Sequence, residues 1–343
     1  MDHVFVGVDI AKLSFEVAVH GPAGDSRWGT FANTAAGFEQ WRVRMQALLE
    51  AQPAQVVVVL GPTGGYELAL AGFAAEQGWL VSRPNALRVR DWLKSQGRRA
   101  KSDGLDADGL ACYGAAQPLA VWKPLPLAYS QLESLLQRQD DLEKMLQQER
   151  NRQAALGLKT GTAAVVGRNL AAVLDSLEQA QAEIQAAIKA HMKAHPTLQA
   201  KARRLLTVPG VGKKSVLFVL VLLARWDTLT DGAGQAKGLV AYAGLDPQTH
   251  TSGTSVYKPA HISRMGNRQM RRRLYLAAFG GVRAKGGPLR EFYVRLVGRG
   301  KAKKLAITAG ARKILTWAWA VYRTDTNFDR ARHVRPNPQP ELA

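Results

Sequence analysis

Three aspartates occur within six residues, at Asp103, Asp106 and Asp108, where the pattern predicts that a helix begins. A three-residue spacing puts Asp103 and Asp106 on one helix face, and Asp108 lies about 140° from Asp103. Neighbouring carboxylates repel unless a cation lies between them, and Mg²⁺ prefers oxygen ligands completed by water and phosphate. The stretch therefore predicts a magnesium site for phosphate chemistry. The alternative is an acidic helix start that only favours the positive end of the helix dipole.

A further carboxylate, Asp9, ends the first predicted strand. Apolar runs and period-two alternation predict strands in residues 4–9, 13–20, 26–31, 55–60 and 79–82. Helices are predicted after the third, fourth and fifth strands, so the order indicates an α/β fold with a mixed sheet. This is the ribonuclease H-like order, in which a first-strand carboxylate lies beside the end of a central strand and a late helix brings further carboxylates. Asp9 and the pair Asp103 and Asp106 occupy those places.

The charge of the chain predicts a polyanionic partner. Its 343 residues include 47 basic and 27 acidic ones, for a formal charge of +20. Residues 258–343 hold 20 basic and 4 acidic residues, a difference of +16. Nucleic acid is the default partner for such a surface. The length is sufficient for two or three domains.

Cysteine usage and hydropathy restrict the compartment. Cys112 is the only cysteine, so an internal disulfide is impossible and a reducing, cytoplasmic setting is expected. The first residues lack a signal-peptide pattern, and the longest apolar run, Val216 to Ala224, is too short to span a bilayer.

The middle of the chain predicts two long helices. Leu132, Leu135, Leu142 and Leu146 form one apolar stripe, and a second follows the glycine-containing break at residues 157–167. The second stripe has heptad spacing, with Gln181 at the missing core position: Leu170, Leu174, Leu177, Ile184 and Ile188. The pattern is typical of a helical hairpin or coiled coil. We favour self-association through this seam over a helical linker packed on its own domain.

The stretch from Leu205 to Lys214 predicts a helix, a Pro-Gly-x-Gly hairpin and a second helix. Gly210 and Gly212 permit a close backbone approach, and exposed N–H groups with Lys213 and Lys214 suit a phosphate. The pattern is of the helix-hairpin-helix type that grips a DNA backbone. A tight helical corner without a ligand is the alternative.

Downstream, a polar segment from His250 to Ser255 predicts an exposed turn, and basic residues follow. Trp317 and Trp319 do not share a helix face, so we expect one of them in the core. The segment from Pro336 is predicted to be disordered. Basic residues elsewhere precede the aspartates, and any single run of them can simply be a solvated face. The candidate nucleic-acid-binding residues are Arg88, Arg90, Lys94, Arg98, Arg99, Lys101, Gly210, Gly212, Lys213, Lys214, Lys258, Arg264, Arg268, Arg271, Arg272, Arg273, Lys303 and Lys304.

Four stretches carry a resemblance to a known family. They are residues 8–12 (Val-Asp-Ile-Ala-Lys), 61–67 (Gly-Pro-Thr-Gly-Gly-Tyr-Glu), 101–107 (Lys-Ser-Asp-Gly-Leu-Asp-Ala), and 209–212 (Pro-Gly-Val-Gly) with the downstream blocks 243–245, 252–255 and 266–273. In this order they resemble the DEDD-type transposases of bacterial insertion sequences, a family that includes the Piv DNA invertases. The resemblance covers nearly the whole chain.

The resemblance implies a recombinase that cuts and rejoins DNA. It implies Mg²⁺ held by an acidic tetrad, here Asp9, Asp103 and Asp106, and a serine nucleophile, here Ser252, that forms a phosphoserine. It also implies a non-coding guide (bridge) RNA that pairs with target and donor double-stranded DNA. Ser252 and the tetrad lie far apart in sequence, so the site must be assembled between domains or subunits. Together with the heptad seam, this split site argues for a homo-oligomer, dimer or tetramer. The setting implied is a bacterial cytoplasm, associated with the nucleoid.

The same resemblance implies a domain plan. Residues 1–125 form an α/β, ribonuclease H-like (RuvC-like) nuclease domain, and residues 126–200 form a helical coiled-coil region. Residues 201–330 form a mostly α transposase domain that carries the serine and a helix-hairpin-helix-like motif, and residues 331–343 form a disordered tail.

One departure from the family pattern bears on activity. The family has Glu where this chain has Gly61, so three of four carboxylates remain. Glu67 lies six residues on, about 9 Å along a helix, which is too far for a simple substitution. Asp108 lies on another helix face. We therefore expect normal binding of RNA and DNA but impaired catalysis.

Two alternatives stay open. A structure-specific junction nuclease would use Asp9, Asp103 and Asp106 with water as the nucleophile, so Ser252→Ala would spare it. A non-catalytic nucleic-acid-binding protein would not be activated by Gly61→Glu.

Overall fold

The computed structural model describes residues 3–21, 24–51, 55–97, 103–158, 160–161, 163–252 and 256–333. Side chains are described for these residues except 51, 103–105, 249–252 and 256–260. The chain divides into two compact units, residues 1–124 with 228–232, and residues 125–227 with 233–343. Each unit has its own hydrophobic core. The predicted division into four parts stays a prediction, as does the tail from Pro336, which lies outside the described residues.

The first unit is built on a five-stranded mixed sheet with the order β3-β2-β1-β4-β5. β1, β2 and β3 are antiparallel, whereas β1, β4 and β5 run parallel. The arrangement confirms the mixed α/β prediction and is compatible with a ribonuclease H-like fold. The elements are β1 (His3–Ile10), β2 (Ser14–Gly21), β3 (Gly24–Ala32), α1 (Ala35–Ala51), β4 (Gln55–Leu60), α2 (Leu68–Glu76), β5 (Leu80–Ser82), α3 (Ala86–Ser95) and α4 (Asp103–Ala116).

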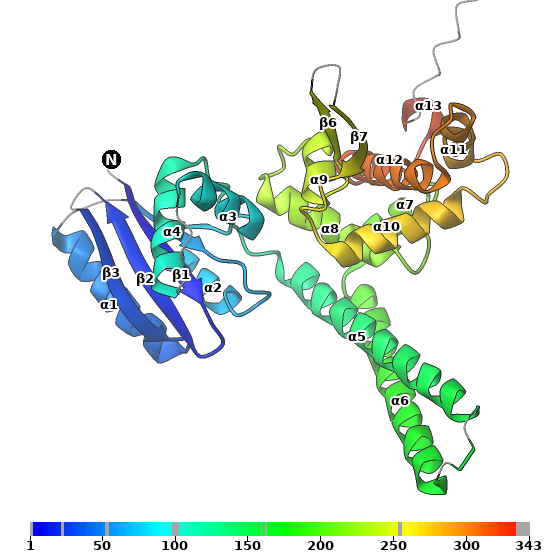
Figure 1. Cartoon of the computed structure of the whole chain (residues 1–343), viewed down its shortest axis with the longest axis horizontal. Helices are drawn as coiled ribbons and strands as arrows, with labels where there is room; N and C mark the ends of the chain where they lie inside the picture. The colour runs from blue at the N-terminus through cyan, green and yellow to red at the C-terminus, as the bar shows by residue number, and fades with distance from the viewer. Residues whose placement is uncertain are drawn as a thin grey trace, which may run out of the picture. The chain divides into compact units, whose positions relative to one another are not determined.

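The side chains of β1 alternate between the two faces of the sheet. Val4, Val6 and Val8 lie in one core cluster with residues of α1 and α2. Phe5, Gly7 and Asp9 lie on the opposite face, which α4 covers (Figure 1). A Cβ atom at Gly7 would lie 2.0 Å from the carbonyl oxygen of Ala107, so only glycine permits this approach of α4. The backbone of α4 is therefore seated directly on β1.

The second unit is mostly helical. Its elements are α5 (Leu127–Leu156), α6 (Ala164–Ala194), α7 (Pro196–Leu205), α8 (Val216–Leu229), α9 (Ala236–Tyr242), β6 (Pro247–Ser252), β7 (Val256–Ile262), α10 (Arg268–Gly281), α11 (Pro288–Gly298), α12 (Lys303–Thr324) and α13 (Arg330–His333). α5 and α6 pack against each other as a helical hairpin (Figure 1). Ile188 of the predicted heptad seam lies in one core cluster with Leu132 and Leu136 of α5. The chain therefore covers part of the seam itself, and self-association through it stays a prediction.

The structure departs from two expectations for this unit. Trp317 and Trp319 are both buried, at 2% and 5% exposure, because α12 is a central helix that packs against α7, α9, α10 and α11. Neighbouring helices cover both rings, and the solvent-exposed positions of α12 lie elsewhere, for example at Arg312 and Arg323. The segment predicted as a polar turn at residues 250–255 begins inside a strand, since β6 runs to Ser252 and pairs antiparallel with β7. Residues 253–255 lie outside the described part of the chain.

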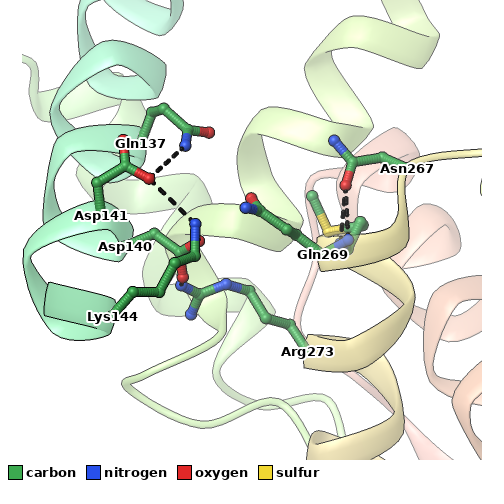
Figure 2. A network of polar contacts seen from close by, with 8 residues as sticks. Gln137, Asp140, Asp141, Lys144, Asn267, Gln269 and Arg273 are labelled. Atoms are coloured by element: carbon green, nitrogen blue, oxygen red, sulfur yellow. Dashed lines mark hydrogen bonds and ion pairs between the residues drawn. The ribbon is translucent and has the colours of Figure 1, made fainter. Parts of the chain in front are cut away.

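A buried ion network joins the helical hairpin to the body of the second unit. Asp140 of α5 is 6% exposed and accepts a hydrogen bond from Arg273 of α10. Lys144 lies 3.0 Å from the other oxygen of the same carboxylate (Figure 2). The guanidinium of Arg273 also lies 3.3 Å above the centre of the Phe218 ring. Such a desolvated, multiply contacted pair orients α5 against α10.

Candidate active site and nucleic-acid interface

Asp9 lies at the end of β1 on the sheet face that α4 covers. It is half-buried and follows Gly7, the point of closest approach of the helix, by two residues. Ala107 lies above Gly7, and a Cβ atom on Gly114 would lie 3.2 Å from the Phe5 ring. The later turns of α4 therefore lie toward Phe5, and the first turn, which begins with Asp103, lies toward the Asp9 end of the strand. The fold therefore brings the N-terminal turn of α4 to the strand end that carries Asp9.

Position 61 faces the same space. Gly61 follows β4 directly, and its N–H donates to the carbonyl oxygen of Val8 at 3.2 Å. A Cβ atom at this position would lie 3.6 Å from Oδ1 of Asp9 and 3.6 Å from Leu110 of α4. These are ordinary van der Waals distances. A side chain at position 61 would thus start beside the Asp9 carboxylate without displacing any neighbour.

The acidic residues of α4 divide between two helix faces. Asp106 is half-buried and precedes Leu110 by four residues, so it shares the helix face that lies against Gly61. Asp103 belongs to the same face by its three-residue spacing, although its side chain lies outside the described part of the structure. Asp108 precedes Cys112 by four residues on a different face. The structure thus places position 61 beside Asp9 and against the helix face that Asp106 shares with Leu110, and the roles of these residues stay a prediction.

Glu16 is a candidate that the sequence interpretation missed. It stands directly opposite Asp9 in the antiparallel register of β1 and β2. Directly opposed residues share a sheet face, with Cβ atoms about 5 Å apart, and two like charges in such a pair repel. Thr30 on β3 donates a hydrogen bond to one carboxylate oxygen of Glu16. The alternation of residues 13–20 predicted the strand that contains Glu16. Its position opposite Asp9 follows only from the register between β1 and β2.

The donors in this group suit a hard divalent cation. Asp9, Asp106 and Glu16 offer carboxylate oxygens, although the oxygens of these three described residues do not all lie within 4.8 Å of one another. Mg²⁺ takes only one or two carboxylates, together with water and phosphate oxygens. Mutual repulsion of the carboxylates would fall when a cation binds between them.

Glu67 has a structural role in the loop after β4. Its side chain is fully buried and accepts hydrogen bonds from the Thr63 hydroxyl at 2.7 Å and the Gly65 N–H at 2.9 Å. It also pairs with Arg83. Burial alone would raise the pKa of Glu67, but these hydrogen bonds and the Arg83 charge outweigh burial and hold the pKa below its usual range. Glu67 therefore orders the loop after β4, and its carboxylate is not available for the role that the family resemblance predicts for a glutamate at position 61.

A basic pocket lies in the second unit, near the base of the β6–β7 hairpin. It has a volume of about 490 Å³, and none of the described residues that line it carries a carboxylate. Burial lowers the pKa of Arg271, and the charges of Arg264 and Arg268 lower it further. Like charges held together without acidic partners indicate a site for an anion. The residues lining the pocket are Leu245, Ile262, Arg264, Arg268, Arg271, Arg272, Tyr275, Thr308 and Ala311.

Two glycines permit a close backbone crossing beside residues that line this pocket. Gly244 has φ +67°, and a Cβ atom on it would lie 2.6 Å from the backbone nitrogen of Gly266. A Cβ atom on Gly266 would lie 2.2 Å from the carbonyl oxygen of Tyr242. The two backbone segments therefore cross in direct contact. Asn267 then caps α10 by accepting hydrogen bonds from the N–H groups of the second and third residues of the helix, which begins with Arg268.

The other predicted binding residues are placed in different ways. Arg88, Arg90, Lys94, Lys213, Lys214, Lys303 and Lys304 are exposed. Arg98, Arg99 and Lys101 lie outside the described residues, as does the side chain of Lys258. Arg273 is only 17% exposed and engages Asp140, so we leave it out of the proposed binding surface.

The helix-hairpin-helix motif is a tight corner at one of its glycines. Gly210 has φ +93°, and a Cβ atom there would lie 2.6 Å from the side chain of Ile314 on α12. This glycine is required by internal packing, as in the alternative interpretation. Gly212 is exposed with nothing near its Cβ position, and Lys213 and Lys214 follow it. These three positions remain candidates for phosphate contact.

Ser252 is the last residue of β6 and pairs with Val256 of β7. Its side chain lies outside the described part of the structure, so its role stays a prediction. Among the described residues, no helix has the length and apolarity that a bilayer span needs.

Comparison with known proteins gives two family matches. Residues 6–159 match a family described as a DEDD transposase of the IS110 type, and residues 202–294 match the transposase IS116/IS110/IS902 family. The chain is 32% identical over 337 residues to the pilin gene-inverting proteins of Moraxella lacunata and Moraxella bovis, covering 97% of this chain and 100% of each relative. It is 34% identical over 172 residues to an uncharacterised 43.6 kDa insertion element IS110 protein of Streptomyces coelicolor, covering 50% of this chain and 40% of that protein.

We expect Glu67→Gln to lower the free energy of unfolding by about 3 kcal/mol at pH 7, because it leaves Arg83 without its buried partner. The lowered pKa of Glu67 means that its stabilisation is present above the unfolded pKa, about 4.3, and is lost as pH falls through the folded value. The difference between wild type and variant should therefore shrink below about pH 4. Urea unfolding at several pH values measures it. Glu76→Gln, an exposed acid at the end of the same helix, is the matched control and should change little at any pH.

Proposed function

The chain belongs to the IS110 family of transposases and DNA recombinases, and from this premise we propose a specific mechanism and partners for it. It cuts and rejoins DNA through Ser252, with a divalent cation held by Asp9, Asp103 and Asp106. A non-coding RNA pairs with the target and donor DNA. The observation that carries this proposal is the convergence of Asp9, position 61 and the Asp106 face of α4 at one strand end.

The carboxylates act by position and charge. Asp9 is held by β1, and Asp106 is held by the helix that Gly7 seats on that strand, so neither can move far from the other. When bound, Mg²⁺ supplies positive charge that orients a phosphate and stabilises the charge developing in phosphoryl transfer. Asp9, Asp103 and Asp106 would hold the ion, each through a carboxylate oxygen.

Ser252 provides the covalent step. Its hydroxyl oxygen attacks a DNA phosphorus and loses its proton, forming a Ser–O–P bond while a phosphodiester P–O bond breaks. The departing DNA oxygen takes up a proton and leaves as a free hydroxyl. A hydroxyl of the second DNA then attacks the phosphoserine, which restores Ser252 and closes a new phosphodiester. The bond count is conserved throughout, so no external energy source is required.

Position 61 sets the level of activity. With glycine there, the fourth carboxylate of the family is missing and catalysis should be impaired. Glu16, on the other side of Asp9 from position 61, supplies a fourth carboxylate from β2 and supports the remaining activity.

We expect Gly61→Glu to raise the rate of recombination at least about tenfold, because the new carboxylate starts 3.6 Å from Asp9 without a clash. The RNA that co-purifies with the protein is sequenced first, then supplied with Mg²⁺ and both DNA partners. Recombined product and the covalent protein–DNA species are measured by gel. Ser252→Ala in the same background should abolish both. DNA cleavage that survives Ser252→Ala would instead support a junction nuclease, and an inactive Gly61→Glu protein would contradict the recombinase mechanism.

We expect Glu16→Gln to weaken binding of Mn²⁺, used as a probe for Mg²⁺, by about tenfold or more, and to lower recombination. In the Gly61→Glu background, Glu16→Gln should lower Mn²⁺ affinity and recombination by a smaller factor, because position 61 then provides a carboxylate. Titration calorimetry gives the affinity independently of activity. Glu39→Gln, on α1 at the opposite sheet face, is the control. Unchanged Mn²⁺ affinity in Glu16→Gln, with a clear loss in Asp9→Asn, would remove Glu16 from the site and leave the rest of the proposal intact.

The arginine pocket of the second unit should bind a nucleic-acid phosphate. We expect Arg268→Ala to weaken DNA binding similarly for all sequences and to lower the slope of log affinity against log salt by about 0.9, the value for one phosphate. Fluorescence anisotropy at several salt concentrations measures the slope. Arg330→Ala removes an exposed arginine of the same unit that is already paired with Glu291, and it should leave the slope nearly unchanged. An equal effect of both substitutions would indicate only the loss of net charge.

A further inference from the structure

Three potential metal ligands from three elements meet on the first unit, away from the carboxylate group. His20 lies near the end of β2, Asp25 lies near the start of β3, and Cys112 lies in α4. One ligand atom of each residue lies within 4.8 Å of the ligand atoms of the other two. No part of the proposed recombination mechanism uses them.

The register of the sheet explains this meeting. His20 stands opposite Phe5 of β1 and opposite Asp25 of β3, so it lies on the face that α4 covers. Cys112 directly follows Ala111, whose backbone nitrogen lies 2.4 Å from the position of a Cβ on Gly7. The glycine contact that brings the start of α4 to Asp9 therefore also fixes Cys112 beside β2.

The His20 ring is poised for a ligand. Its Nδ1 atom lies against the Asp25 carboxylate, yet it has no hydrogen-bond partner of ordinary geometry among the described residues. The side chains of His20 and Asp25 are 38% and 51% exposed and Cys112 is partly exposed, so the three residues lie at the surface of the unit, with His20 Nδ1 itself buried between them.

We propose that His20, Asp25 and Cys112 form a site for a borderline-soft divalent cation of the Zn²⁺ class. Imidazole nitrogen, thiolate sulfur and carboxylate oxygen are the donors that Zn²⁺ takes, and three protein ligands leave a fourth position for water. The S–H bond of Cys112 breaks on binding, its proton passes to solvent, and a metal–sulfur bond forms without oxidation or reduction. The thiolate distinguishes this site from the all-oxygen group at Asp9, which suits Mg²⁺.

Metal binding here would join an edge strand to the helix of the carboxylate group. β3 is at the sheet edge, whereas α4 carries both Cys112 and Asp106. A cation that binds the folded state raises the melting temperature, because the unfolded chain holds no preformed site.

The test uses Co²⁺, a spectroscopic substitute for Zn²⁺, on the full-length protein. Because Cys112 is the only cysteine, a thiolate-to-cobalt charge-transfer band in the near ultraviolet reports this site alone. We expect a 1:1 complex with this band, displaced by Zn²⁺. The band should disappear in Cys112→Ser, and the affinity should fall at least about tenfold in His20→Ala and Asp25→Asn.

Two controls keep the proposal falsifiable. His261→Gln removes an exposed histidine of the second unit and should leave the band and the affinity unchanged. In the wild-type protein, Zn²⁺ should slow alkylation of Cys112 by iodoacetamide. This control does not depend on the folding of any variant. Metal binding that persists in Cys112→Ser without a thiolate band, alkylation that ignores Zn²⁺, or the absence of 1:1 binding would each overturn the proposal.

Discussion

The first unit depends on one close contact between a helix and a strand. The backbone of α4 approaches β1 so closely at Gly7 that a methyl group there would overlap the Ala107 carbonyl. The same helix also contacts Phe5 and Val59 at Gly114, and a rigid helix held at two points places the other residues along it. The acidic turn of α4 is thereby brought to the Asp9 end of the strand, while Cys112, further along, is brought to His20. These two contacts thus position two groups of quite different chemistry.

The second unit uses the same device. Gly244 and Gly266 let two backbone segments cross in contact, and α10 begins immediately after the crossing. Four arginines then surround one pocket without a carboxylate among the described lining residues. Burial lowers the pKa of Arg271, and the charges of Arg264 and Arg268 lower it further, so holding these cations together is a cost that the fold tolerates. A bound phosphate would offset that cost, which is why the pocket is a better guide to binding than net charge alone.

Neighbouring arginines have different roles in this unit. Arg272 lines the pocket, whereas Arg273 turns inward to Asp140 and the Phe218 ring. Adjacent residues on a helix point about 100° apart, so a basic run divides between solvent and core. Acidic residues divide between roles in the same way. The carboxylate of Glu67 lies near the candidate site, but it accepts hydrogen bonds from its loop and pairs with Arg83.

The sequence by itself determined the strands of the first unit, the mixed sheet and the place of Asp9 at a strand end. These follow from local periodicity and from motif order, which a single chain displays directly. Only the tertiary structure placed Glu16 opposite Asp9, joined His20, Asp25 and Cys112, buried both Trp317 and Trp319, and separated Arg273 from the pocket arginines. Each of these depends on strand register or helix packing between segments distant in sequence. Local patterns fix the period of an element, but not which neighbour its faces will meet.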